Sequence, residues 1–208
     1  MKQARRDRER QMGRKPTGEL RRGWTTGACA AAATKAAYVA LLTGRFPDPV
    51  AIRLPSGEQP RFDLAETGLH GHQAVAAVVK DAGDDPDVTH GALVRATVRR
   101  GESGTGVMFI AGDGVGVVTR PGLALAVGEP AINPAPRRLI REMVADVARD
   151  WGDAGDLEVT ISIPDGEILA RRTTNGRLGR GPGRGLHPPS RRRRGGRPAL
   201  QPRRRRRA

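Results

Sequence analysis

Bulky and reactive residue types are scarce in this chain of 208 residues. Aromatic residues make up 3% of it, against 28 glycines and 16 prolines, so we expect a small core and segments outside that core. One cysteine, Cys29, excludes an intrachain disulfide and fits a reducing compartment. No apolar run approaches the roughly 20 residues of a membrane span. The Arg-rich amino terminus lacks the apolar segment of a secretory signal, so we expect a cytoplasmic protein.

Positive charge is concentrated at the two ends of the chain. The formal net charge is +15, but residues 24–179 hold 16 basic and 19 acidic residues. Residues 180–208 hold twelve arginines and no acidic residue. A nucleic-acid-binding protein usually carries its basic patch on the folded domain, and this middle segment does not. We therefore predict a disordered basic lead-in over 1–22, a folded domain over 23–179 and a disordered tail over 180–208.

Apolar periodicity in the middle segment predicts an α/β or α+β fold. We expect an Ala-rich helix over Ala28–Leu42 that ends at Gly44, and a long amphipathic helix that opens at Asn133 and ends at Gly152. A mixed sheet should contain strands near 50–54, 74–79, 93–98, 107–110 and 157–163. The predicted apolar face of the second helix holds Leu139, Ile140, Met143, Val144, Val147, Ala148 and Trp151, with Arg137, Arg138, Arg141 and Asp146 mostly opposite.

An acidic run between two predicted strands is the first candidate for chemistry. Its possible catalytic residues are Asp84, Asp85, Asp87 and His90. Crowded carboxylates raise one another's proton affinity or recruit a cation or a hydrogen-bond donor. The spacing fails the pattern of a calcium loop, and a solvated turn explains the same composition. Neither this run nor the histidines show metal-ligand spacing, so we predict no metal site.

A glycine-rich segment follows the predicted strand at 107–110. Gly112, Gly114 and Gly116 have the spacing of a nucleotide or S-adenosylmethionine loop. That mechanism requires a helix directly afterwards, whose amino-terminal amides face the ligand. Pro121 and Gly122 are poor helix formers. We therefore prefer a glycine-rich hairpin or a close approach between backbones, and keep these glycines as weak binding candidates.

The starts of the two predicted helices provide the remaining candidates. Thr25, Thr26 and Gly27 precede the Ala-rich helix, where hydroxyls and free amides can bind an anion beside the helix dipole. Glu129 and Asn133 precede the second helix. Simple capping is the competing explanation for one threonine and for Asn133. Cys29 is expected to be a small buried residue.

These segments, in this order, resemble the amino-terminal half of the CbiD family. The resemblance covers Leu20 to Gly179 and includes Arg22–Cys29, and its long, unusual segments Lys80–Gly91 and Val127–Pro136 make it specific. It implies transfer of a methyl group from S-adenosylmethionine to carbon 1 of cobalt-precorrin-5B in anaerobic cobalamin biosynthesis. The implied partner is therefore a cobalt corrinoid, a large flat molecule rimmed with carboxylates.

The chain departs from the family pattern at Arg180. Family members continue there with an apolar Gly-Gly-x-Ser-Ile-Leu stretch and a second α/β region, whereas this chain has an Arg/Gly/Pro tail. A one-base shift over the codons for Pro182 to Pro188 permits Leu-Gly-Gly-x-Ser-Ile-Leu, so we interpret the tail as out-of-frame translation of a truncated, inactive enzyme. Two alternatives stay open: a basic-tailed protein that binds nucleic acid without sequence preference, and a structural domain with no activity.

Overall fold

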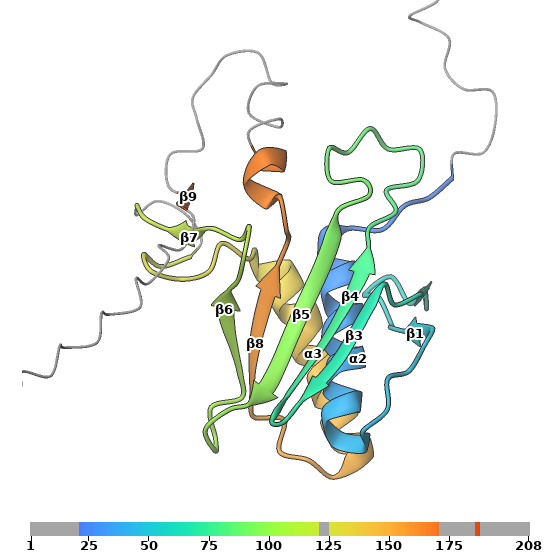
Figure 1. The fold of residues 1–208 in the computed structure, drawn as a ribbon, viewed down its shortest axis with the longest axis vertical. Helices are drawn as coiled ribbons and strands as arrows, with labels where there is room; N and C mark the ends of the chain where they lie inside the picture. Colours follow the sequence, from blue (N-terminus) through green and yellow to red (C-terminus); the bar gives the residue numbers. More distant parts are fainter. Residues whose placement is uncertain (1–20, 121–124, 171–185, 188–208) are drawn as a thin grey trace, which may run out of the picture.

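The computed structural model describes residues 21–120, 125–170 and 186–187. Its centre is a five-stranded sheet in the order β3-β4-β5-β8-β6. All neighbours are antiparallel except β6 and β8, which are parallel. Figure 1 shows both long helices on one face of this sheet. The predicted α/β class with a mixed sheet is therefore confirmed.

The sheet strands follow the predicted positions closely, with one addition. They are β3 (Glu66–His70), β4 (Gln73–Val79), β5 (Leu93–Arg100), β6 (Val107–Ala111) and β8 (Leu157–Ser162). The additional strand is β3, which pairs along its whole length with β4. The strand expected over 50–54 is shorter than predicted: β1 (Val50–Ala51) pairs with β2 (Arg61–Phe62) outside the main sheet. Val117–Val118, as β7, pairs with β9 (Leu186–His187), and β9 lies within the predicted tail.

The Ala-rich helix, α2 (Thr26–Thr43), lies at the centre of the packing. Gly44 ends it with φ 76°, a conformation that favours glycine. Its alanines are buried around the whole circumference, because α2 packs against β4, β5 and α3 at once. Small side chains permit this close packing on every side. Cys29 is fully buried, and burial raises the pKa of its thiol to about 11, so it acts as a packing residue.

The second helix, α3 (Pro134–Trp151), carries the predicted apolar face with two exceptions. Trp151 was expected to be buried but is 57% exposed, because the helix ends there and Gly152 turns the chain away. Arg137 was expected to face solvent but is 9% exposed. The loop that precedes α3 folds back over it and supplies polar partners. Between the parallel strands β6 and β8, α3 provides the crossover that parallel pairing requires.

A polar cluster around Asp153 closes the end of the domain beyond α3. Arg100 donates to Asp153 Oδ1 at 2.5 Å, Tyr38 donates to the other oxygen, and the Gly155 amide donates at 3.1 Å. Burial by itself would raise the pKa of Asp153, but these hydrogen bonds outweigh it and hold the pKa at about 2. The carboxylate therefore stabilises the fold in its ionised form.

We expect Asp153→Asn to lower the free energy of unfolding at pH 7 by about 2 kcal/mol, measured by urea titration. The folded-state pKa lies below the ordinary value of 3.8, so the stabilisation is complete above pH 3.8 and is lost as the pH falls through about 2. The two proteins should therefore converge in stability in acid. Asp146→Asn is the control, because Asp146 pairs with Arg149 on the exposed surface and should cost under about 0.5 kcal/mol. Equal losses for both variants would contradict the assignment.

Candidate binding pocket

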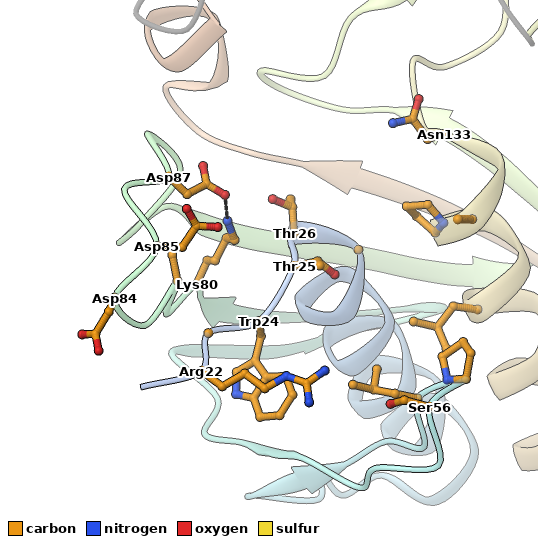
Figure 2. A pocket seen from close by; sticks show the side chains of 18 of the residues that line it. Arg22, Trp24, Thr25, Thr26, Ser56, Lys80, Asp84, Asp85, Asp87 and Asn133 are labelled. Carbon is orange, nitrogen blue, oxygen red and sulfur yellow. Dashed lines mark hydrogen bonds and ion pairs between the residues drawn. The ribbon is translucent and has the colours of Figure 1, made fainter. Parts of the chain in front are cut away.

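A pocket with a volume of about 1210 Å³ opens between the amino ends of α2 and α3. Figure 2 shows its walls converging from segments that are distant in the sequence. Four groups of residues form the lining: the helix starts Thr25, Thr26, Gly27, Asn133, Ala135, Pro136 and Leu139; the chain 21–24; the loop residues Leu54, Pro55 and Ser56; and Lys80, Ala82, Asp84, Asp85, Pro86 and Asp87.

The amino end of α2 presents hydrogen-bond donors to this pocket. Thr25 is the N-cap, and its hydroxyl accepts from the Ala28 amide at 3.1 Å. The capping explanation therefore holds for Thr25. The Thr26 hydroxyl has no hydrogen-bond partner within the described ranges, and Thr26 and Gly27 line the pocket. Neither α2 nor α3 has an acidic residue in its first turn, so the positive ends of both helix dipoles are uncompensated there.

Close backbone contacts fix the geometry of the pocket wall. The Trp24 amide donates to the Asp81 carbonyl at 2.8 Å, and the Asp84 amide donates to the Arg21 carbonyl at 3.0 Å. The chain 21–24 therefore runs antiparallel to 81–84, and a Cβ at Gly23 would lie 1.8 Å from the Ala82 carbonyl carbon. A Cβ at Gly27 would lie 2.8 Å from Pro136 Cγ, so the amino ends of α2 and α3 touch.

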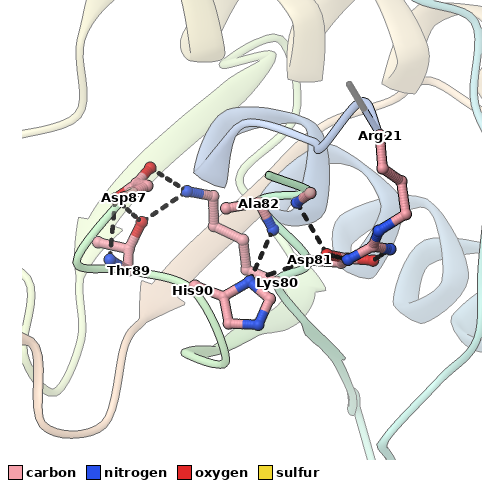
Figure 3. Close-up of polar contacts among 8 residues, drawn as sticks. Arg21, Lys80, Asp81, Ala82, Asp87, Thr89 and His90 are labelled. Atoms are coloured by element: carbon pink, nitrogen blue, oxygen red, sulfur yellow. Dashed lines mark hydrogen bonds and ion pairs between the residues drawn. The ribbon is translucent and has the colours of Figure 1, made fainter. Parts of the chain in front are cut away.

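A buried lysine anchors the acidic loop (Figure 3). Lys80 is 2% exposed, and its ammonium donates to Asp87 Oδ2 and to Thr89 Oγ1, the latter at 2.6 Å. The Thr89 amide and hydroxyl donate to Asp87 Oδ1 at 2.8 and 2.7 Å. Burial alone would raise the pKa of Asp87, but these donors lower it to about 2. Asp87 is therefore an oriented, ionised carboxylate in the pocket wall.

The other acidic-loop candidates have different surroundings. Asp84 Oδ2 accepts from the Arg21 amide at 2.6 Å, and Figure 2 shows its side chain directed away from the other labelled residues. The Asp85 side chain lines the pocket and has no partner in residues 21–120 or 125–170. His90 accepts from the Ala82 amide at 3.1 Å and lies outside the pocket lining. The loop is thus partly a turn stabilised by its own hydrogen bonds, and Asp84, Asp85 and Asp87 all line the pocket.

The glycine-rich candidates lie elsewhere and pack against the protein's own backbone. A Cβ at Gly114 would lie 1.8 Å from the Ile163 carbonyl oxygen, and one at Gly112 would lie 2.1 Å from Ser162 Oγ. Neither these residues nor Gly116 line the pocket. The expected close backbone approach is present, between the segments that follow β6 and β8. At Gly112 and Gly114 the protein's own atoms therefore occupy the space that a side chain would take.

The two candidates before α3 have separate roles. Glu129 lies outside the pocket and pairs with Arg137 at 3.1 Å. Arg137 also donates to the Ile132 and Pro130 carbonyls at 2.8 and 2.7 Å, so it binds the loop 129–132 to α3. Asn133 occupies the N-cap position, but its side chain makes no capping hydrogen bond and lines the pocket.

Several pocket residues were not identified from the sequence. Lys80 had a partial signal, a lone lysine that ends an apolar strand and precedes an acidic run. Trp24 precedes the Thr-Thr-Gly turn and contacts Phe62 edge-to-face at 6.0 Å between ring centroids, while Arg22 lies 5.8 Å over its indole. Ser56 comes from a turn with no functional signal. Within the described ranges, no group of three or more His, Cys, Asp or Glu residues could hold a metal, and no helix is long and apolar enough to cross a membrane.

An open, mostly apolar pocket with a few polar groups, between two helix starts of a two-layer α/β domain, is typical of a small-molecule-binding domain. The CbiD family model matches residues 13–183, so the chain belongs to the CbiD family. The match leaves residues 184–208, with their arginine runs, outside it.

Named relatives agree with this family. The chain is 64% identical over 160 residues to the cobalt-precorrin-5B C(1)-methyltransferase of Agrobacterium fabrum, and 62% identical over 160 residues to that of Paramagnetospirillum magneticum. These matches cover 77% of this chain and 42% and 45% of the relatives. The crystal structure of the cobalamin biosynthesis protein CbiD of Archaeoglobus fulgidus is 31% identical with a TM-score of 0.55, over 77% of this chain and 49% of that one. The chain therefore spans less than half the length of these relatives.

Proposed function

We propose that this domain binds the cobalt corrinoid of an S-adenosylmethionine-dependent methyl transfer to carbon 1 of cobalt-precorrin-5B, in the cytoplasm. The observation that carries the proposal is the pocket of about 1210 Å³ between two helix starts without acidic residues. A corrinoid is large, flat and rimmed with carboxylates. Such a ligand needs a wide site with hydrogen-bond donors at its edge.

The pocket residues divide into two chemical groups that match the two reactants. The Thr26 hydroxyl and the first-turn amides of α2 are donors suited to a carboxylate of the corrinoid. Asp85 and Asp87 are carboxylates suited to a cationic or N–H group. When bound, S-adenosylmethionine supplies the methyl group from a cationic sulfonium. The contribution of this domain is to hold the acceptor carbon in line with that group and to exclude water.

Binding of cobyrinic acid, a corrinoid with free carboxylates, tests the proposal directly. The chain has two tryptophans, and only Trp24 lines the pocket. In a Trp151→Phe background, quenching of Trp24 fluorescence therefore reports occupancy. We expect saturable quenching by cobyrinic acid and binding at least about tenfold weaker for cobinamide, whose carboxylates are amidated. Equal affinity for both corrinoids would refute carboxylate recognition, and no quenching by either would refute the pocket as a corrinoid site.

Removal of one donor should weaken this binding. Thr26→Val keeps the shape of the side chain and removes the hydroxyl, so we expect a five- to tenfold higher dissociation constant for cobyrinic acid, about 1 kcal/mol. Thr43→Val is the matched control, because Thr43 lies at the other end of the same helix and its hydroxyl donates to the Val39 carbonyl at 2.8 Å. The control should bind like the parent. A larger loss in Thr43→Val than in Thr26→Val would contradict the assignment.

The alternative of nucleic-acid binding and the division of the chain at residues 22 and 179 stay predictions. The arginine runs of the tail lie outside the described residues. Arg21 and Arg22, at the boundary of the lead-in, contact the folded domain. The Arg21 side chain donates to Asp81 Oδ1 at 2.9 Å, and the backbone of Arg22 forms an antiparallel β-bridge with that of Gly83.

A further inference from the structure

Lys80 is an ionisable side chain to which the proposed function assigns no role. It directly follows β4, is 2% exposed and still lines the pocket. An ammonium removed from water costs several kcal/mol unless it is paired and hydrogen-bonded. Methionine in its place would fill the same volume without that cost. A lysine here therefore calls for a role that an apolar residue cannot perform.

The partners of Lys80 indicate that role. Both partners, Asp87 and Thr89, belong to the acidic loop, and Thr89 in turn donates to the second oxygen of Asp87. The ring of hydrogen bonds fixes the direction of one carboxylate, which is 35% exposed at the pocket. The loop is already closed by backbone bonds, from the Lys80 amide to the Ala92 carbonyl at 2.9 Å and from the Gly91 amide to the Lys80 carbonyl at 2.8 Å. Backbone hydrogen bonds therefore hold the loop, and the Lys80 ammonium in addition fixes the orientation of the Asp87 carboxylate.

We infer that Lys80 is a positioning residue that keeps Asp87 ionised and aimed into the pocket, where Asp87 contacts a cationic or N–H donor group of the ligand. This inference rests on the proposed function and assigns a specific group within it. Asp87 is the contacting residue, and Lys80 acts through it. The other titratable groups around the pair are Asp85 on the same loop, Asp81 and His90 at its base, and Cys29 on α2.

A pH series separates positioning from mere support of the fold. The ligand is S-adenosylmethionine, which carries a sulfonium and an ammonium group that a carboxylate can contact. Its dissociation constant is measured by Trp24 quenching in Trp151→Phe protein from pH 8 to pH 5, for the parent and for Lys80→Met. Titration of the ligand itself affects both constants equally, so it cancels in their ratio. Without the donor and the charge of Lys80, Asp87 should have a higher pKa than in the parent and should lose its charge at a higher pH. We expect the ratio to rise toward pH 5, to about tenfold.

Three further variants complete the comparison. Lys80→Arg keeps the cation and should rescue binding to within about threefold, with a ratio that does not change with pH. Asp87→Asn is neutral at every pH and should give about a tenfold ratio that is also independent of pH. Lys35→Met is the matched control: the Lys35 ammonium donates to the Ala51 carbonyl at 2.8 Å and does not line this pocket, so its ratio should stay at one.

Each outcome decides the matter. A flat Lys80→Met ratio, with only a lower melting temperature, would mean that Lys80 supports the fold alone, and it would leave the proposed function intact. Absence of S-adenosylmethionine binding by the parent would overturn the inference, whereas absence of cobyrinic acid binding would overturn the proposed function. If Lys80→Met does not fold, Lys80→Arg and Asp87→Asn still test the inference. Parental affinity in Asp87→Asn would overturn it, and so would binding by Lys80→Arg that is more than about threefold weaker than that of the parent.

Discussion

Gly23→Ala should destabilise the domain by about 3 kcal/mol or more and lower its melting temperature by about 10 °C, as followed by circular dichroism. The added Cβ would lie 1.8 Å from the carbonyl carbon and 2.4 Å from the Cα of Ala82. Both contacts are with backbone, which cannot rotate away as a side chain can. The chain 21–24 would have to separate from 81–84 and lose the Trp24–Asp81 backbone bond of 2.8 Å.

Gly68→Ala is the matched control for this change. Gly68 lies in β3, and its Cβ would meet only the far end of the exposed His70 ring, at 2.7 Å from Nε2. That ring can rotate into solvent, so we expect a change within about 0.5 kcal/mol. Because the chain 21–24 also forms one wall of the pocket, Gly23→Ala should weaken cobyrinic acid binding as well. Similar stability for the two variants would show that the close approach at Gly23 relaxes at little cost.

The fold was predictable wherever apolar residues that become buried recur at a regular spacing along the chain. Leu157, Val159 and Ile161 alternate in the sequence and are all at most 3% exposed in β8. The alanines of α2 were assigned to a helix by composition and end signals. Strand β3 was not predicted, because apolar and polar residues do not alternate in its sequence, Glu-Thr-Gly-Leu-His. Its conformation comes from pairing with β4, a non-local interaction that leaves no periodic signal.

The site was predictable only in the parts that lie at helix starts and in the acidic run. Thr26, Asp85, Asp87 and Asn133 were candidates, and they converge on one pocket. Lys80 was not a candidate, because its importance arises from its burial and its partners. Gly112 and Gly114 show the opposite limit. A sequence cannot distinguish a glycine that admits a ligand from one that admits the protein's own backbone, and here a carbonyl of the protein fills the space.

The buried position of Arg137 has a consequence for both stability and binding. Helical spacing places this residue among polar neighbours, but the loop before α3 covers it. It donates to two loop carbonyls and pairs with Glu129, and its guanidinium lies 5.4 Å from the centroid of the Phe109 ring. A planar group with five donors can satisfy all these contacts at once, which an ammonium cannot. Arg137 thereby holds the loop that places Asn133 at the pocket.

We therefore expect Arg137→Met to lower the free energy of unfolding by about 3 kcal/mol, because the Ile132 and Pro130 carbonyls lose their donor. Arg137→Lys should recover less than half of that loss. Arg138→Met, at the next and exposed position of α3, is the control and should change stability by under about 0.5 kcal/mol. Urea unfolding measures all three.

The same variants test whether the loop matters for the ligand. With the loop released, Asn133 should leave its place in the pocket wall, and cobyrinic acid should bind more weakly to Arg137→Met than to Arg138→Met at a temperature where both are folded. Binding that is unchanged in Arg137→Met, despite a loss of stability, would show that Asn133 keeps its position through the helix start alone. In that case the two prolines of the first turn, Pro134 and Pro136, are sufficient to hold it, since their fixed φ angles are already helical.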